Sequence, residues 1–303
     1  MGIKKRKKRL SKESFGIYFI LPYFIVFAVF GVYSIVYTFY LSFNKWDGIM
    51  PIAKVGLNNF KRLLQDKYFY LTLYNTIRIW IFNYIPQICT ALLLSCIFTF
   101  NRIKGMKFFR AAFYLPNLIT AASVGLLFNL FFNGDNSIVN YILIELDVIH
   151  EPISFFLSEV FTSSIVSYIQ WWMWYGYTTV IVMAGMTTVD QNLYEAAMVD
   201  GATKFRVFRY ITMPLIRPTI IYLTITSIIG GMQLFDVPST LTNANGDPQK
   251  SILTTTMYIY NQGFKSFNYG YASAISVGLF FIIAILSVIA FRLMKGKDNT
   301  YEN

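Results

Sequence analysis

Charged residues are scarce in this sequence. They make up 14% of its 303 residues, whereas a soluble domain carries about 25%. A soluble protein of this length could bury a large apolar core, but 55% hydrophobic residues with so little charge leaves too much apolar surface to cover. The charges are also unevenly placed, because long blocks contain none. These features argue against a soluble globular fold.

Residues that carry chemistry are scarce as well. Cys89 and Cys96 are the two cysteines, seven apart, in no metal or redox spacing, so we expect them to be small packing residues. His150 is the one histidine, and it cannot assemble a zinc site alone. The phosphate-loop pattern G-x-x-x-x-G-K-[ST] is absent, so the chain does not bind ATP by that route. We therefore expect neither a metal nor a cofactor on this chain.

The apolar blocks also lack a clear carboxylate, lysine or histidine near their middle. Asp236 comes nearest, and Arg78 lies at the end of a block. Ion-coupled transporters keep such groups inside the membrane despite their cost. A secondary transporter remains an alternative that uptake driven by an ion gradient alone would reveal. An intramembrane enzyme would need a constellation that Asp236 and peripheral His150 cannot form.

Six charge-free blocks dominate what is present. Each is near or above the roughly 18 to 20 residues that span a ~30 Å hydrocarbon core as a helix, where backbone groups must be satisfied within the segment. The first is too long for the apolar core of a cleaved signal peptide. We predict an all-α integral membrane protein with six transmembrane helices. The blocks are Ser14–Asn44, Ile79–Asn101, Ala111–Gly134, Val160–Val189, Pro218–Phe235 and Ser266–Phe291.

The net charge of +11 has two interpretations. The run Lys4–Arg9 resembles a nucleic-acid patch, but basic residues beside membrane spans set orientation. With a cytoplasmic amino terminus, the predicted cytoplasmic segments hold most of the 26 basic residues. We therefore predict two cytoplasmic termini and no nucleic-acid partner. The predicted organisation is a basic tail (1–14), a six-helix domain (15–295) with a cytoplasmic loop (190–217), and a second tail (296–303).

Two segments outside the blocks have helical patterns. Val55–Asp66 is predicted to be an amphipathic helix on the outer surface. In the loop, Asp190 is a suitable N-cap, and Gly201 can take the left-handed conformation that ends a helix. Thr203 can then cap a second helix over residues 204–211, which Pro214 is expected to stop. By pattern alone, this loop would be an ordinary connector on the membrane surface.

The exact residues of the loop add a resemblance. Glu195-Ala196-Ala197, three residues, Gly201, nine residues and then Ile211-x-Met213-Pro214 resemble the EAA loop of ABC importer permeases, E-A-A-x3-G-x9-I-x-L-P. Methionine for leucine is the one departure, and it conserves volume. Further segments are similar to carbohydrate-uptake permeases of the maltose and glycerol-phosphate type, first subunit. These segments are 19–48, 56–64, 111–119, 234–248, where the L-T-x-G-G-P motif carries an insertion and lacks one glycine, and 270–276.

The resemblance implies a type I importer permease in a bacterial inner membrane. Its loop would be the coupling helix that contacts an ATPase dimer, which binds ATP and Mg in place of this chain. The other implied partners are a second homologous permease subunit, an extracellular solute-binding protein, membrane lipid and a carbohydrate, most simply an oligosaccharide, with glycerol phosphate or another polyol as alternatives. The implied coupling residues are Glu195, Ala196, Ala197, Asp200, Gly201, Ala202 and Pro214.

A sugar pathway needs a few convergent polar groups and aromatic faces. The fourth and fifth blocks supply candidates. Each has an ordinary alternative, because Trp also forms interfacial belts and Gln also joins helices. Gly231 stands where the family would carry an Asn, so its contact with substrate is in doubt. The candidates are Gln170, Trp171, Trp174, Tyr175, Ser227, Gly231, Gln233 and Asp236.

Overall fold

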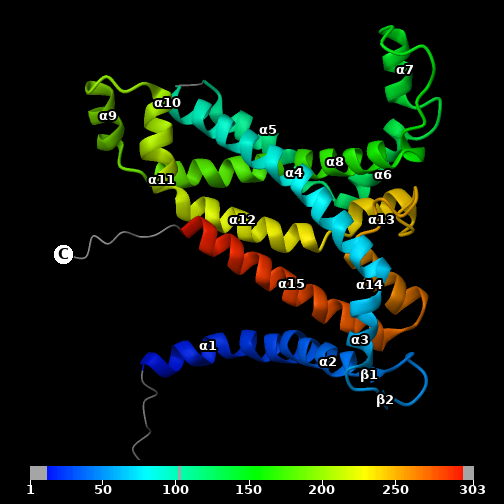
Figure 1. Ribbon diagram of the computed structural model, residues 1–303. Helices are drawn as coiled ribbons and strands as arrows, with labels where there is room; N and C mark the ends of the chain where they lie inside the picture. The colour runs from blue at the N-terminus through cyan, green and yellow to red at the C-terminus, as the bar shows by residue number, and fades with distance from the viewer. Residues whose placement is uncertain (1–11, 102–103, 296–303) are drawn as a thin grey trace, which may run out of the picture.

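The protein is a bundle of long helices with short helices at both ends (Figure 1). The computed structural model describes residues 12–101 and 104–295, so the predicted tails lie outside it except for residues 12–14. The elements are α1 (Lys12–Val26), a π-helical turn (Phe27–Val32), α2 (Tyr33–Ser42), β1 (Asn44–Lys45), β2 (Ala53–Lys54), α3 (Asn58–Gln65), α4 (Lys67–Phe100), α5 (Met106–Leu118), α6 (Ala121–Phe132), α7 (Ile138–Glu145), a 3-10 turn (Phe155–Leu157), α8 (Glu159–Thr187), α9 (Gln191–Val199), α10 (Lys204–Val207), a π-helical turn (Phe208–Thr212), α11 (Met213–Leu215), α12 (Arg217–Met232), α13 (Asp236–Thr242), α14 (Thr255–Tyr260), a π-helical turn (Asn261–Lys265) and α15 (Tyr269–Lys295).

Each of the six predicted blocks is helical. By length and composition, four helices of the described residues can cross a membrane, or five if the bent pair α5 and α6 counts as one span. The remaining block, the fourth (α8), is long enough to cross a membrane, since its 29 residues extend about 43 Å. It is more polar because Thr162, Ser167, Gln170 and Thr179 are buried inside the bundle. The all-α fold is confirmed.

The third block is not one straight helix. It breaks between α5 and α6, whose axes differ by 89°. Ile119 is extended, and Thr120 caps α6 by accepting a hydrogen bond from the Ser123 amide. An extended residue followed by a good N-cap starts a new helix in a new direction. The bend places the start of α6 inside the bundle.

The α4–α8 pair is the centre of the bundle (Figure 1). Ile79, Val166 and Ile169 are at most 1% exposed in their interface. On another side of α8, a Cβ on Gly176 would overlap the carbonyl of Phe113 on α5. Small residues at such crossings let backbones approach closely, which is how helices associate in a membrane.

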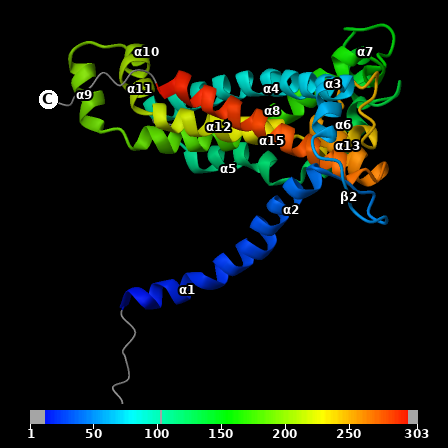
Figure 2. The ribbon, with the colours of Figure 1, turned by 60° about the horizontal axis from the view of Figure 1, so that its bottom comes forward.

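The first span leaves the bundle. Figure 2 shows α1 and α2 extending away from the other helices, with contact at the α2 end against α15. Phe39 meets Phe280 there, with ring centroids 6.1 Å apart. Farther out, Phe19 is 89% and Phe30 is 73% exposed. An apolar arm of this length needs lipid or another protein to cover it.

The predicted amphipathic helix is present as α3, with Leu63 buried. It leads into Asp66, which caps α4 by accepting hydrogen bonds from the backbone amides of Tyr68 and Phe69. The hydroxyls of Tyr258 and Tyr271 donate to the same carboxylate. Burial would raise the pKa of Asp66, but these hydrogen bonds outweigh it and hold the pKa below its usual value. Asp66 thus ties α3 and α4 to α14 and α15.

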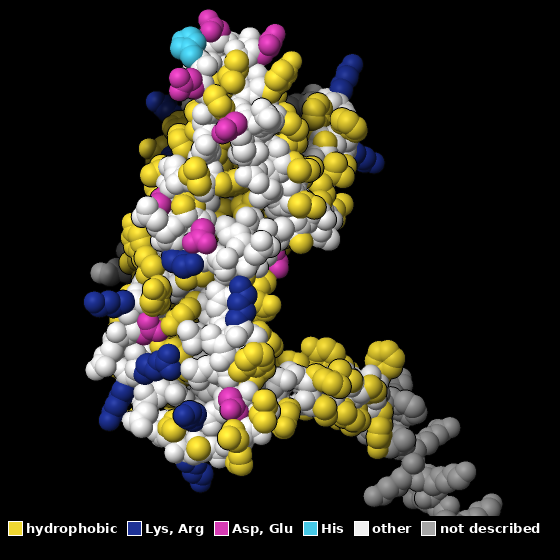
Figure 3. Space-filling model, turned by 90° about the vertical axis from the view of Figure 1, so that its right-hand side faces the viewer, with side chains coloured by type: hydrophobic (Ala, Val, Ile, Leu, Met, Phe, Trp, Pro, Cys, Tyr) yellow, Lys and Arg dark blue, Asp and Glu magenta, His cyan; other side chains and the backbone are white. Residues whose placement is uncertain are grey.

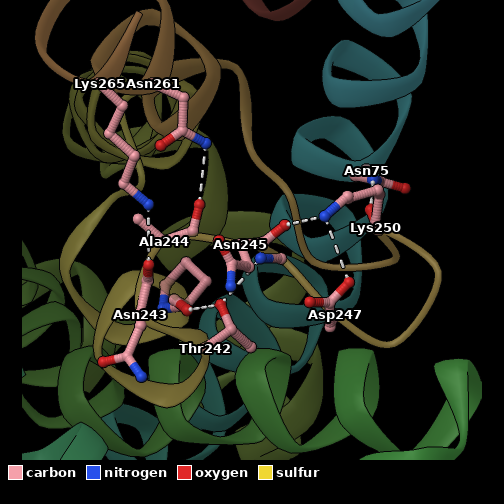
Figure 4. Close-up of polar contacts among 11 residues, drawn as sticks. Asn75, Thr242, Asn243, Ala244, Asn245, Asp247, Lys250, Asn261 and Lys265 are labelled. Carbon is pink, nitrogen blue, oxygen red and sulfur yellow. Dashed lines mark hydrogen bonds and ion pairs between the residues drawn. The ribbon is translucent and has the colours of Figure 1, made fainter.

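The segment between α13 and α14 is fastened to α4 (Figure 4). Asn75 of α4 donates from its amide to the carbonyls of Lys250 (2.7 Å) and Leu253 (3.2 Å). Within the segment, the Gly246 amide donates to the Thr242 hydroxyl at 2.9 Å. These bonds hold an otherwise irregular loop in place at this end of the bundle. Figure 3 looks onto this end, where the histidine and several acidic residues lie together at the top and many basic residues lie lower down, with acidic residues among them.

Candidate functional site

A cavity of about 390 Å³ lies between α4, α8 and α12, beside the start of α6. This volume falls in the range of small-ligand sites. Six of the eight predicted pathway residues line it. They come from α8, from α12 and from the segment that follows α12: Gln170, Trp174, Ser227, Gly231, Gln233 and Asp236.

The other two predicted pathway residues do not line this cavity. The Trp171 indole N–H donates to the Thr90 hydroxyl at 3.2 Å. Tyr175 stacks on Trp171, with centroids 5.4 Å apart. In a helix with 3.6 residues per turn, positions 170, 173, 174 and 177 share a face, and 171 and 175 turn away from it. The structure therefore separates the two aromatic residues from the cavity.

Two amides of α4 line the cavity and were not predicted. Asn83 is 7% and Gln87 is 6% exposed. The Gln87 amide donates to the Thr178 hydroxyl at 2.6 Å. The buried Oδ1 of Asn83 has no hydrogen-bond partner within the described residues. An unsatisfied buried oxygen beside a cavity can accept a hydrogen bond from a ligand hydroxyl. Their spacing of four in a charge-free block was the available signal, since it puts both on one helical face.

Packing of Trp80 from α4 limits how Ser227 and Gly231 of α12 can contact a ligand. The Trp80 indole N–H donates to the Ser227 hydroxyl at 3.0 Å. A Cβ on Gly231 would overlap the Trp80 ring. The indole therefore occupies the space that a side chain at position 231 would need. One turn away, Tyr84 and Thr224 share a hydrogen bond of 2.6 Å.

The predicted turn in the loop at the other end of the bundle is confirmed. Asp190 caps α9, with its carboxylate accepting from the Asn192 amide at 3.0 Å. Gly201 has φ +78°. Its amide bonds to the Met198 carbonyl, and the Ala202 amide to the Ala197 carbonyl. This pair of bonds is the Schellman motif, which terminates a helix at a left-handed residue.

Thr203 caps the second helix, as predicted, but Pro214 does not stop it. The helical path runs through α10, the π-helical turn at 208–212 and α11, and ends at Ile216. A proline ring inside an α-helix clashes with the carbonyl four residues earlier, here Tyr210. A π-helical turn directly before Pro214 widens the helix at that carbonyl, so the helix continues past the proline.

Few contacts hold α9 against the bundle. Tyr194 is its one buried residue. Its ring meets Phe100 of α4 edge-on, with centroids 5.5 Å apart, and its hydroxyl accepts from Thr212 at 3.3 Å. Lys204 reaches Asn101 at 2.9 Å. These contacts place α9 beyond the ends of α4 and α8, at the opposite end from α3 and α14 (Figure 1).

The rest of α9 and its turn faces outward. Val199 is 87% and Phe205 is 74% exposed, and Met198 and Leu193 are about half exposed. Apolar side chains gathered on a short projecting helix indicate a surface for contact with protein or membrane. The predicted coupling residues lie among them. Exposed are Glu195, Ala196, Asp200, Gly201 and Pro214, and half-buried are Ala197 and Ala202.

Comparisons with known proteins agree with this geometry. The family described as "Binding-protein-dependent transport system inner membrane component" matches residues 76–297. The chain is 30% identical over 283 residues to the lactose transport system permease protein LacF of Rhizobium radiobacter, covering 93% of this chain and 94% of the relative. It is 31% identical over 286 residues to the arabinooligosaccharides transport system permease protein AraP of Bacillus subtilis, covering 93% and 89%.

A solved structure has the same fold. A chain of a bacterial ABC transporter involved in the import of the acidic polysaccharide alginate matches with a TM-score of 0.77 and 21% identity, over 95% of this chain and 98% of that chain. The predicted importer-permease fold is thereby confirmed. The family match covers well over half of the sequence. The chain therefore belongs to the inner membrane components of binding-protein-dependent transport systems, and it is a permease subunit rather than an enzyme.

Proposed function

We propose that this chain forms half of the carbohydrate pathway of an ATP-binding-cassette importer and couples it to a separate ATPase. The arrangement of two sites carries this proposal. A polar and aromatic cavity lies inside the helix bundle, and a projecting helix with an exposed apolar surface lies at one end of it. Relatives named for lactose and arabinooligosaccharides support a sugar as substrate.

The cavity offers what sugar recognition requires. Gln170, Gln87 and Asn83 present amides for hydroxyl groups, and the exposed face of Trp174 can cover an apolar sugar face. Gly231 and Ser227 contribute backbone and shape, because Trp80 already occupies their side-chain space. A disaccharide or short oligosaccharide is the substrate class we propose.

The loop of α9 would seat in a cleft of the ATPase subunit. Val199, Phe205 and Met198 supply apolar contact area, and Glu195 can pair with a basic residue of the partner. ATP and Mg would bind to the ATPase, whose closure moves α9 and switches the bundle between two states. Because α9 and α4 meet through Tyr194 and Phe100, motion of α9 can reach the cavity walls.

Other partners follow from the remaining surfaces. The exposed arm α1–α2 would pack on a second homologous permease subunit and on lipid. The end of the bundle with α3, α7 and α13 would face an extracellular solute-binding protein, which places both termini in the cytoplasm of a bacterial cell. Basic residues at positions 204, 206 and 209 beside α9 agree with this orientation.

Reconstitution in proteoliposomes tests the proposal. The chain would be assembled with its partner permease, the ATPase dimer and the binding protein, and uptake of radiolabelled oligosaccharides would be measured with and without ATP. We expect uptake only when ATP and every subunit are present. Uptake that an ion gradient drives in the absence of the ATPase would refute the proposal.

A further inference from the structure

A second concavity, of about 550 Å³, lies between α4 and α8. It shares no lining residue with the transport cavity. Its walls include Phe82, which is 67% exposed, and Tyr168, which is 48% exposed, so it opens on the outside of the bundle. Nothing in the proposed transport cycle uses this groove.

Arg78 of α4 lines the groove with an uncompensated charge. Among the described residues, no carboxylate lies within 4 Å of it. One guanidinium nitrogen donates to the Ser251 carbonyl at 2.9 Å, and the Tyr74 ring centre lies 5.6 Å from the guanidinium carbon. The Nε atom is buried without a partner. A guanidinium at a membrane span that retains unused donors is a binding group for an anion, and phosphate fits its geometry.

The groove is polar at one end and apolar at the other. Ser167 approaches the Ile79 carbonyl at 3.5 Å, which puts the backbone next to Arg78 level with the third turn of α8. Pro86 lies eight residues farther along α4, about 12 Å away. Phe82 and Trp171 also line the groove on its apolar side. A soluble anion would use only the arginine end, whereas a lipid would use both.

The level of Arg78 fits a lipid headgroup. Its partner Ser251 belongs to the loop at the end of the bundle that carries α3 and α14, and Val160 in the first turn of α8 lines the same groove. Phosphate groups of the bilayer lie at the ends of the apolar spans, and acyl chains run inward from them. We propose that the groove binds one anionic phospholipid, with its phosphate on Arg78 and an acyl chain along Phe82, Pro86 and Trp171.

The test uses the assembled transporter in lipid discs of phosphatidylcholine alone or of equal phosphatidylcholine and phosphatidylglycerol. Lipid that stays bound after transfer to detergent is identified by native mass spectrometry. Arg78→Gln removes the charge. Ser164→Phe fills the groove from an exposed position of α8 and leaves Arg78 intact. Lys54→Gln removes one charge from exposed β2 at the same end of the bundle and is the matched control.

We expect wild type and Lys54→Gln to retain phosphatidylglycerol in preference to phosphatidylcholine. Arg78→Gln should reduce retention about fivefold, the loss expected for one basic residue at an anionic surface. Ser164→Phe should abolish it. Equal retention of the two lipids, unchanged retention in both groove variants, or displacement by inorganic phosphate would overturn the proposal. So would a disulfide between Phe82→Cys and the arm of the second permease subunit, since the groove would then hold protein.

Discussion

A substitution at Asn83, whose amide oxygen lacks a hydrogen-bond partner within the described part of the chain, can show an effect on transport separately from an effect on stability. Asn83→Leu keeps a γ-branched side chain and removes the polar atoms. The buried Oδ1 has no hydrogen-bond partner among the residues that the structure describes, which costs about 1–3 kcal/mol. Leucine removes this cost, so we expect the empty transporter to be as stable as wild type or more stable. A sugar hydroxyl bound to Oδ1 contributes about 0.5–1.5 kcal/mol, so its loss should raise the KM for uptake about two- to tenfold.

The same helix offers a control of the opposite kind. Asn75 is 2% exposed, and its amide donates to the carbonyls of Lys250 and Leu253. Asn75→Leu leaves both carbonyls without this donor, so we expect a loss of about 1–3 kcal/mol in stability. Thermal unfolding of the assembled complex and the KM for ATP-dependent uptake would be measured for both variants.

The two amides should then differ in both measurements. Asn83→Leu should raise KM without lowering thermal stability, and Asn75→Leu should lower thermal stability. If Asn83→Leu unfolds as early as Asn75→Leu, then Asn83 is structural and the reasoning is wrong. Wild-type KM in a stable Asn83→Leu protein would also refute a role in substrate binding.

Three further predictions concern other parts of the chain. Gly201→Val forces a β-branched residue to φ +78°, so ATP hydrolysis should continue with little uptake while the protein stays inserted; a normal ratio of uptake to hydrolysis would contradict this. Gly176→Val should destabilise the complex by about 1–3 kcal/mol or more, because its Cβ overlaps the Phe113 carbonyl, and denaturation would show it; a normal melting temperature would exclude that crossing. Asp66→Asn should lower the melting temperature at neutral pH. The pKa of Asp66 is lowered in the folded protein, so its contribution to stability is fully present above the ordinary carboxyl pKa of about 3.9 and is lost as the pH falls through the folded pKa. The higher melting temperature of the wild type should therefore vanish in acid. A difference in melting temperature that does not depend on pH would refute this role of Asp66.

Local chemistry made part of this structure predictable. Asp190, Gly201 and Thr203 act on backbone within a few residues, so their roles as caps and turn follow from their types. The six blocks follow from the exclusion of charge. The predictions failed where distant parts of the chain decide. The block 111–134 is free of charge throughout, and its length alone does not show that Thr120 restarts the helix at 89°.

The rotation of α8 about its axis explains which predictions of cavity-lining residues were wrong. Gln170 and Trp174 face it, and Trp171 and Tyr175 do not, because which side of α8 meets α4 is decided by packing across the whole bundle. Asn83 lies within a charge-free block, and its lack of a hydrogen-bond partner among the described residues is visible only once α8 and α12 are in place. The Pro214 prediction failed because a π-helical turn accommodates the ring, which no short pattern indicates.

The position of α9 against the ATPase is the central claim, and Val199 tests it most directly because it is 87% exposed. In a chain with Cys89 and Cys96 replaced by serine, Val199→Cys would be paired with a cysteine in the docking cleft of the ATPase. We predict a disulfide that joins the two subunits and stops uptake until a reductant is added. Labelling of Val199→Cys by an impermeant maleimide from outside intact cells, with no adduct to the ATPase, would contradict the account.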